Sequence, residues 1–96
     1  MAKGYWIARI SVKQPERYDE YKELAGPAYK AHGAKFLVRG GGFAVSEGES
    51  RERNVVIEFP TYQAALDCYN CDQYAKARAV RKEISVGELV VIEGTE

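Results

Sequence analysis

Two apolar runs joined by a polar segment constrain the fold of this chain more than any other feature. The first run covers residues 35–46 and contains three consecutive glycines at positions 40–42, and the second covers residues 54–59 and ends at Pro60. Glycines inside a strand usually mark a bulge or a tight bend, and a proline removes the next backbone donor from a sheet. The pattern therefore predicts a strand that bends at the glycines and resumes to residue 46, a charged turn over residues 47–53, and a further strand.

Helical spacing predicts two helical segments, one before these two strands in the sequence and one after them. The first begins at Pro15, which suits the first turn of a helix, and ends at Gly33, which we expect to be a left-handed cap. The Gly-Pro pair at residues 26–27 should kink or split this helix. The second begins at the N-cap Thr61, breaks near residues 70–72 and then continues with another apolar stripe.

Strands at the two ends of the chain complete the pattern, over the alternating residues 5–12 and the apolar residues 88–93. The order strand, helix, strand, strand, helix, strand is typical of the ferredoxin-like split βαβ arrangement (βαββαβ). This is an α+β fold in which a four-stranded antiparallel sheet carries its helices on one face. No repeat or linker divides residues 1–96, so we expect a single domain.

Several of the predicted strands are apolar on both faces, although helices cover only one face of such a sheet. The neighbouring residues that show this are Ile7 and Ala8, Val56 and Ile57, and Val90 and Val91. A sheet that is apolar on both faces needs a second layer. We therefore predict a homodimer through sheet-to-sheet packing, a barrel-like assembly about a two-fold axis.

Charge and hydropathy exclude some classes of function. Lysine plus arginine equals aspartate plus glutamate, at 14 each, so the overall positive field that gathers nucleic-acid phosphates is missing. The start of the chain runs straight into a strand pattern without a signal segment, and no apolar run is long enough to span a membrane. We expect a cytoplasmic protein that binds neither nucleic acid nor membrane.

Cys68 and Cys71 have the C-x-x-C spacing of redox and metal sites. Thioredoxin-like pairs open a helix, where the helix N-terminus lowers the thiol pKa, whereas Cys68 falls late in the helical pattern that starts at Thr61. A zinc site would need two further ligands. We interpret both cysteines as packing residues, and we expect neither a metal nor another cofactor.

Arg39 is the strongest candidate for a ligand-binding residue, because a guanidinium in an apolar strand needs a carboxylate, carbonyl groups or a ligand anion. A regular hairpin around Ser50 places its side chain on the helix side of the sheet, whereas an extra residue at the glycines places it on the dimer side. Glu58 is a candidate proton acceptor. The alternative to anion binding is an internal salt bridge among Arg39, Arg9, Glu58 and Glu47.

His32 is the only histidine, so it is the first candidate for a general acid or base near neutral pH. Its place just before Gly33 suits a plain helix C-terminal residue equally well, because the helix dipole stabilises a cation there. The sequence leaves both interpretations open.

Tyr69 and Tyr74 flank the predicted helix break. In one interpretation they line a ligand pocket between the helices and the sheet, and in the other the tyrosines fill the core. The basic run over residues 76–82 alternates with Ala and Val, which is typical of the solvated side of a helix.

Short segments along nearly the whole chain carry a family resemblance, at residues 4–8, 36–41, 47–48, 56–60, 64–65, 69–70, 74 and 91–94. Through them the chain resembles the small bacterial proteins of domain-of-unknown-function family 1330. The resemblance implies a dimeric α+β barrel, in the ferredoxin-like superfamily that also holds cofactor-independent monooxygenases, and it implies no particular activity. Cys68 and Cys71 depart from the usual pattern of that family, which weakens a redox role for the pair.

Two functions follow from these candidates. In the first, a homodimer binds a small organic carboxylate or enolate-like molecule and transforms it without a cofactor; Arg39, Tyr69 and Tyr74 bind the molecule, and His32 or Glu58 accepts its proton. In the second, the protein is a non-catalytic dimeric ligand-binding or structural module. An open cavity on which these groups converge favours the first function, and a filled core with Arg39 in a salt bridge favours the second.

Overall fold

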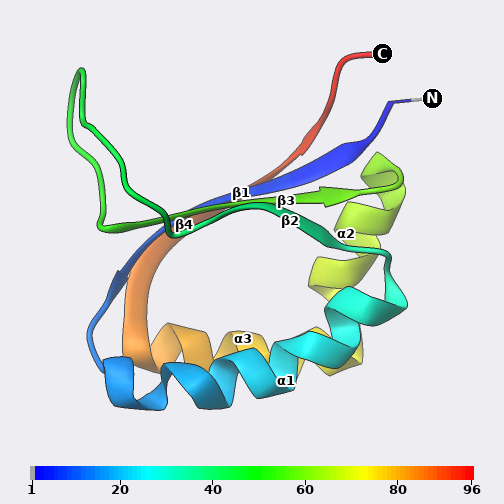
Figure 1. Cartoon of the computed structure of the whole chain (residues 1–96). Helices are drawn as coiled ribbons and strands as arrows, with labels where there is room; N and C mark the ends of the chain where they lie inside the picture. The colour runs from blue at the N-terminus through cyan, green and yellow to red at the C-terminus, as the bar shows by residue number, and fades with distance from the viewer. Residues whose placement is uncertain (1) are drawn as a thin grey trace.

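Residues 2–96 are described by a computed structural model, in which helices cover one face of a four-stranded antiparallel sheet (Figure 1). The elements along the chain are β1 (Gly4–Val12), the 3-10 turn η1 (Pro15–Arg17), α1 (Tyr18–Ala31), β2 (Lys35–Arg39), β3 (Arg53–Phe59), α2 (Tyr62–Asn70), α3 (Asp72–Ile84) and β4 (Ser85–Glu93). The strand order is β2-β3-β1-β4 and each neighbouring pair is antiparallel. The predicted ferredoxin-like α+β fold is confirmed, with α2 and α3 together forming the second helical segment.

The helix ends follow the local signals in the sequence. The side chain of Thr61 caps α2 by accepting a hydrogen bond from the backbone N–H of Ala64 at 3.0 Å. Gly33 has a φ of 71° just after α1, which is the left-handed conformation expected of a glycine cap. Cys71 is extended, with a ψ of 158°, and separates α2 from α3.

Helix α1 is continuous through Pro27, so the predicted split at this position is not observed. Proline removes one helical donor, which would have bonded the carbonyl of Glu23 four residues earlier. Both residues lie on the exposed side of α1, so water can satisfy this carbonyl.

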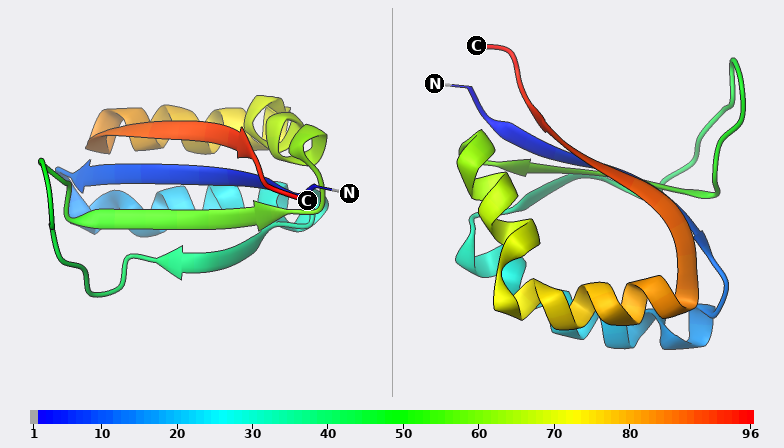
Figure 2. Two further views of the ribbon diagram at one scale, coloured as in Figure 1. Left: turned by 90° about the horizontal axis from the view of Figure 1, so that it is seen from above. Right: turned by 180° about the vertical axis from the view of Figure 1, so that it is seen from behind.

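The prediction that the second strand resumes after the glycines is wrong. Strand β2 ends at Arg39, and within the described chain residues 41–46 belong to no strand. Gly40, with a φ of 64°, turns the chain out of the sheet, and the segment rises on the side away from the helices before it returns to β3 (Figures 1 and 2). Because β3 begins only at Arg53, residues 43–46 have no β3 partner, and Phe43 is 54% exposed.

A β-bulge in β2 decides which way Arg39 faces. Phe36 lies opposite Ile57 and Arg39 lies opposite Val55, with the irregularity falling between Phe36 and Val38 rather than at the glycines. Directly opposed residues of an antiparallel pair point to the same face of the sheet. Arg39 therefore points to the helix side, the first of the two orientations that the sequence left open.

The core lies between the sheet and the helices and is centred on Trp6, which is 1% exposed. Its indole Nε1 donates a hydrogen bond to the backbone oxygen of Ala65 at 2.9 Å, which ties β1 to α2. Its ring centroid lies 5.3 Å from that of Phe59 and 4.9 Å from that of Tyr74. Aromatic packing of this kind adds to the burial of apolar area.

The opposite face of the sheet carries no helix in the described chain (Figure 2), and we call it the uncovered face. Ile7 lies on this face opposite Val56 on β3 and Val90 on β4. Exposed apolar side chains on it are Ile7, Val38, Val86, Val90 and Ile92. Their exposed fractions, 39% to 56%, agree with the predicted need for a second layer.

Candidate functional site

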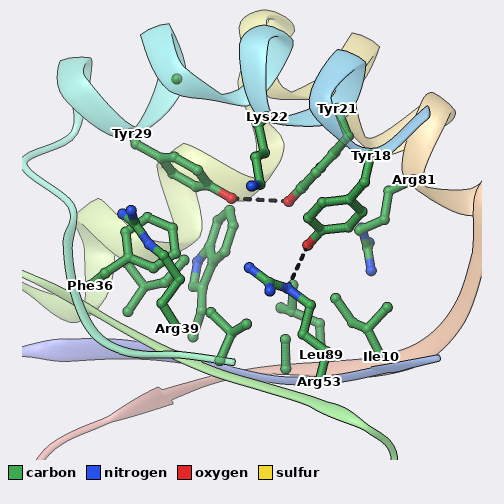
Figure 3. Close-up of a pocket in the computed structure, with 15 residues that line it drawn as sticks. Ile10, Tyr18, Tyr21, Lys22, Tyr29, Phe36, Arg39, Arg53, Arg81 and Leu89 are labelled. Carbon is green, nitrogen blue, oxygen red and sulfur yellow. Dashed lines mark hydrogen bonds between the residues drawn. The ribbon is translucent and has the colours of Figure 1, made fainter. Parts of the chain in front are cut away.

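A cavity of about 240 Å³ lies between α1, α3 and the helix side of the sheet, and we call it the central cavity (Figure 3). Its volume is below the roughly 300–1,000 Å³ typical of drug-sized ligands, so a small molecule fits it best. Lys22, Gly26 and Arg39 are exposed lining residues and mark its mouth beside the edge strand β2. The rings that line it are Trp6, Tyr18, Tyr21, Tyr29 and Phe36.

Positive charge gathers around this apolar cavity. Its lining includes Lys22, Arg39, Arg53 and Arg81, and no Asp or Glu among residues 2–96 belongs to it. The chain as a whole is neutral, so the charges are segregated rather than in excess. Cations around a low-dielectric cavity without a facing carboxylate favour an anionic ligand.

Arg81 is the most unusual of these residues because it is almost wholly buried. Its exposed fraction is 7%, and its Nε is buried without a hydrogen-bond partner in the part of the chain that the structure describes. No ion pair involves it within those same residues. A buried guanidinium left in this state is destabilising unless a further group satisfies it.

Arg39 and Arg53 are held against aromatic rings at the sheet side of the central cavity. The guanidinium carbon of Arg39 lies 3.8 Å from the ring centroid of Phe36, a contact that the bulge in β2 makes possible. Arg53 stacks 4.9 Å from the ring centroid of Tyr18 and donates from Nε to its hydroxyl at 2.9 Å. Neither guanidinium pairs with a carboxylate within residues 2–96, so both charges are available to a ligand.

A chain of tyrosine hydroxyls forms part of the cavity wall on the helix side. The hydroxyl of Tyr21 lies 2.9 Å from that of Tyr29 and 2.8 Å from that of Tyr74 (Figure 3 shows the first of these bonds). Burial raises the pKa of all three phenols well above the usual value of 10.0. They are therefore protonated at neutral pH and act as hydrogen-bonding groups, not as bases.

The predicted binding residues meet this cavity to different extents. Arg39 lines it directly. Tyr74 is fully buried and reaches it only through its hydrogen bond to Tyr21. Tyr69 lies outside it and lines a second cavity of about 340 Å³ between α3 and β4. Its backbone oxygen accepts a hydrogen bond from Arg78 at 2.7 Å.

The two predicted proton acceptors lie away from the central cavity. His32 follows α1, and its Nδ1 lies 2.8 Å from the backbone oxygen of Ala28. Glu58 is on the uncovered face, where it accepts hydrogen bonds from Lys3 at 3.2 Å and from the hydroxyl of Tyr5 at 3.4 Å. The structure therefore does not bring either residue together with Arg39.

Arg81 is the residue that the sequence analysis missed. The interpretation of residues 76–82 as a solvated basic run is wrong at this position, because Arg81 points inward from α3 with Tyr74, Ala77 and Ile84. The spacing of three, four and three residues along this stripe is helical, so it contains the signal. An arginine on an apolar helical stripe therefore indicates a buried guanidinium.

Neither cysteine contacts the central cavity. Burial raises the pKa of the Cys68 thiol to about 12, and its Sγ lies 3.6 Å from the backbone oxygen of Ala28. The Sγ of Cys71 accepts a hydrogen bond from the backbone N–H of Tyr74 at 3.4 Å and so caps α3. Among residues 2–96 no group of His, Cys, Asp and Glu side chains is placed to hold a metal ion, and no helix is long and apolar enough to cross a membrane.

The chain belongs to the family described as Domain of unknown function (DUF1330), whose family model matches residues 3–95. This confirms the family that the sequence resembled. A search of curated proteins found no match to the chain.

Solved structures show where else this fold occurs. A protein of unknown function from Rhodopseudomonas palustris has a TM-score of 0.76 and 16% identity, with 99% of this chain and 84% of that chain covered. The cofactor-independent oxygenase SnoaB from Streptomyces nogalater has a TM-score of 0.65 and 10% identity, with 100% and 96% covered. A dimeric ferredoxin-like protein of unknown function from Thermobifida fusca has a TM-score of 0.62 and 12% identity, with 99% and 92% covered. At these identities the likeness supports the ferredoxin-like fold alone.

Proposed function

We propose that this member of the DUF1330 family binds a small organic anion, a carboxylate or an enolate, in the central cavity. The observation that carries the proposal is the buried guanidinium of Arg81, which lines an apolar cavity without a partner among residues 2–96. An anionic ligand supplies the missing acceptor, and charge-assisted hydrogen bonds are the strongest of the polar contacts available.

The remaining lining residues fit the same class of ligand. Arg39 and Arg53 add positive charge at the sheet side, while Trp6, Tyr29 and Phe36 provide an apolar surface for a compact carbon skeleton. The site needs no cofactor to bind such a molecule. SnoaB, a cofactor-independent oxygenase, uses the same fold, which supports small-molecule chemistry without a cofactor in this architecture.

The first function left open by the sequence combines ligand binding with proton abstraction, and of these two parts ligand binding has the stronger support. His32 and Glu58 lie outside the central cavity, and the raised pKa values of Tyr21 and Tyr29 keep these two lining phenols protonated. A proton acceptor must reach the proton that it removes, within about 2.6–3.2 Å or through one water. We therefore propose binding as the basal function.

Calorimetric titration with benzoate and with its neutral amide, benzamide, tests the proposal. We expect benzoate to bind and to raise the melting temperature, and benzamide to do neither. Arg39→Gln should weaken benzoate binding about tenfold, since it removes a charge-assisted contact. Lys35→Gln is the matched control, because Lys35 is on the same strand but faces Glu58 on the uncovered face. Equal binding of benzoate and benzamide, or binding of neither, would refute the proposal.

We also propose that the protein is a cytoplasmic homodimer in which two uncovered faces pack together. Ile7, Val90 and Ile92 give this face an apolar surface, and two of its carboxylates are already paired within the subunit. Arg51 lies 2.7 Å from Glu88, and Lys3 lies 3.2 Å from Glu58. Paired charges are less costly to bury than isolated ones. The dimeric relative from Thermobifida fusca supports the assembly, and the free thiols suit a reducing compartment.

Sedimentation at micromolar concentration tests the homodimer. We expect the unaltered protein to sediment as a pair, and Val90→Lys to give single subunits because a lysine would be buried without a partner. Tyr62→Lys is the control, since Tyr62 is an exposed aromatic residue on α2, away from the uncovered face. A single subunit for the unaltered chain would refute this assembly.

A further inference from the structure

We infer that the central cavity recognises its ligand at two points, with the hydroxyl chain of Tyr74, Tyr21 and Tyr29 donating one hydrogen bond to a second oxygen of the bound anion. The arginines bind the acid group, and the hydroxyl chain binds a carbonyl or enolate oxygen elsewhere on the same molecule. The ligand class is therefore an oxo or enolic acid on a compact apolar skeleton. This inference rests on the proposed function and adds a second contact to it.

The three tyrosine hydroxyls hold one more proton than their mutual hydrogen bonds use. Each phenol supplies one O–H donor. The three hydroxyls therefore hold three protons, and the bonds from Tyr21 to Tyr29 and from Tyr21 to Tyr74 use two of them. The remaining proton is either donated to a group other than these three hydroxyls or stays without a hydrogen bond.

Burial decides where this proton lies. The hydroxyl of Tyr74 is enclosed, since the side chain is 0% exposed, and among the described residues Tyr21 is its only hydrogen-bond partner. If Tyr74 did not donate to Tyr21, its proton would be buried without an acceptor, which is unfavourable. Tyr74 therefore donates, and the spare proton lies on Tyr21 or Tyr29. Both of these residues line the central cavity.

The spare donor faces the central cavity from the side opposite the arginines of the sheet. In Figure 3 the hydroxyls of Tyr21 and Tyr29 hang from α1, and Arg39 and Arg53 rise from the sheet below them. A ligand in the cavity thus meets Arg39 and Arg53 at the sheet wall, and at the helix wall it meets the neutral donor beside Lys22 and Arg81. A site with a fixed donor discriminates against analogues that leave this donor unpaired.

The test compares benzoate with 3-acetylbenzoate and 4-acetylbenzoate, which add a carbonyl acceptor at two positions of the ring. We expect at least one acetylbenzoate to bind the unaltered protein roughly threefold to tenfold more tightly than benzoate, the effect of one neutral hydrogen bond. Replacing both Tyr21 and Tyr29 by Phe should bring the affinities for benzoate and for the acetylbenzoates to within about twofold of one another, because either hydroxyl alone could still donate its proton into the cavity. Tyr62→Phe, a change at an exposed tyrosine, should retain the gain in affinity.

A second variant separates donation from a structural effect. Tyr74→Phe removes the buried end of the chain but leaves Tyr21 free to donate to Tyr29, so the gain should persist. Equal loss of the gain in Tyr74→Phe and in the double variant at Tyr21 and Tyr29 would show a packing effect and overturn the inference. Circular dichroism of each variant verifies that it is folded.

The infrared carbonyl band of the bound acetylbenzoate gives a measurement that needs no variant. We expect the band to lie at a lower frequency than in an apolar aprotic solvent, because a hydrogen bond weakens the C=O bond. An unshifted band, or no gain over benzoate for either acetylbenzoate, overturns the two-point inference and leaves the proposed anion site standing. Failure of benzoate itself to bind would instead remove the proposed function.

Discussion

Replacing Arg81 by methionine should make the free protein more stable and its ligand binding weaker. The side chain is 7% exposed, and its Nε has no hydrogen-bond partner among residues 2–96. Methionine ends near the position of the arginine Nε, so it can replace the aliphatic stem, and the space that the rest of the guanidinium leaves adjoins a cavity that is already open. The substitution therefore removes a buried unsatisfied donor and creates little cavity.

The size of the effect follows from the burial of this one group. An unsatisfied buried donor is destabilising by about 1–3 kcal/mol, so Arg81→Met should raise the free energy of unfolding by about that amount. In a domain of this length each kcal/mol shifts the melting temperature by roughly 4–8 °C. The loss of a charge-assisted hydrogen bond should weaken benzoate binding about 10-fold to 100-fold.

Arg78→Met is the matched control on the same helix. Arg78 donates to the backbone oxygen of Tyr69 at 2.7 Å and stacks 4.8 Å from its ring centroid, so its guanidinium is satisfied. Its replacement should lower the free energy of unfolding by about 1 kcal/mol and leave benzoate affinity unchanged.

Urea unfolding and calorimetry on the two variants measure the opposed effects. A loss of stability in Arg81→Met as large as that in Arg78→Met would show that Arg81 is held by contacts within the protein. Such a result would refute the reasoning, because the case for an anion depends on a guanidinium without a protein partner.

Three further predictions concern stability and reactivity. Burial raises the pKa of Tyr21, Tyr29 and Tyr74, so the folded protein holds protons that the unfolded chain releases above pH 10.0. The stability that these phenols contribute should be complete below that pH. Above it, each phenol should lower the free energy of unfolding in urea by about 1.4 kcal/mol per pH unit, so the slope in Tyr74→Phe should be less steep by one such contribution. Identical slopes for the two proteins would contradict this. Iodoacetamide should modify Cys71 before Cys68 in the folded protein, since burial raises the pKa of the Cys68 thiol to about 12, and mass spectrometry of timed samples would expose the reverse order. Trp6→Phe should lower the free energy of unfolding by about 2–3 kcal/mol in urea, because it removes ring packing and the hydrogen bond to Ala65; a change below 1 kcal/mol would argue against Trp6 as the centre of the core.

Much of the fold was predictable because its signals are local. The cap at Thr61, the left-handed Gly33 and the break at Cys71 each depend on the conformation of a few neighbouring residues. Alternating and helical periodicity then fixed the order of strands and helices. The strand predicted at residues 43–46 failed because pairing is not local: the residues have strand propensity, and β3 begins too late to face them.

The candidate site depended more on tertiary structure. Arg39 was recognised from its residue type, but a one-residue irregularity between Phe36 and Val38 decided that it faces the helices. Arg81 was taken for a solvated residue, because a basic run on a helix usually lies on its exposed face. The folded structure shows that this position is buried, on the same helical stripe as Ala77 and Ile84.

The sequence by itself determined the elements, their order and an apolar uncovered face, since these follow from spacing along the chain. Only the tertiary structure joined the hydroxyls of Tyr21 and Tyr74 and enclosed Arg81 without a protein partner. The physical reason is that a hydrogen bond or an unsatisfied charge depends on the atoms around it, and here those atoms come from segments far apart in the chain. Composition gives equal numbers of positive and negative side chains, but folding decides which of them surround the same cavity.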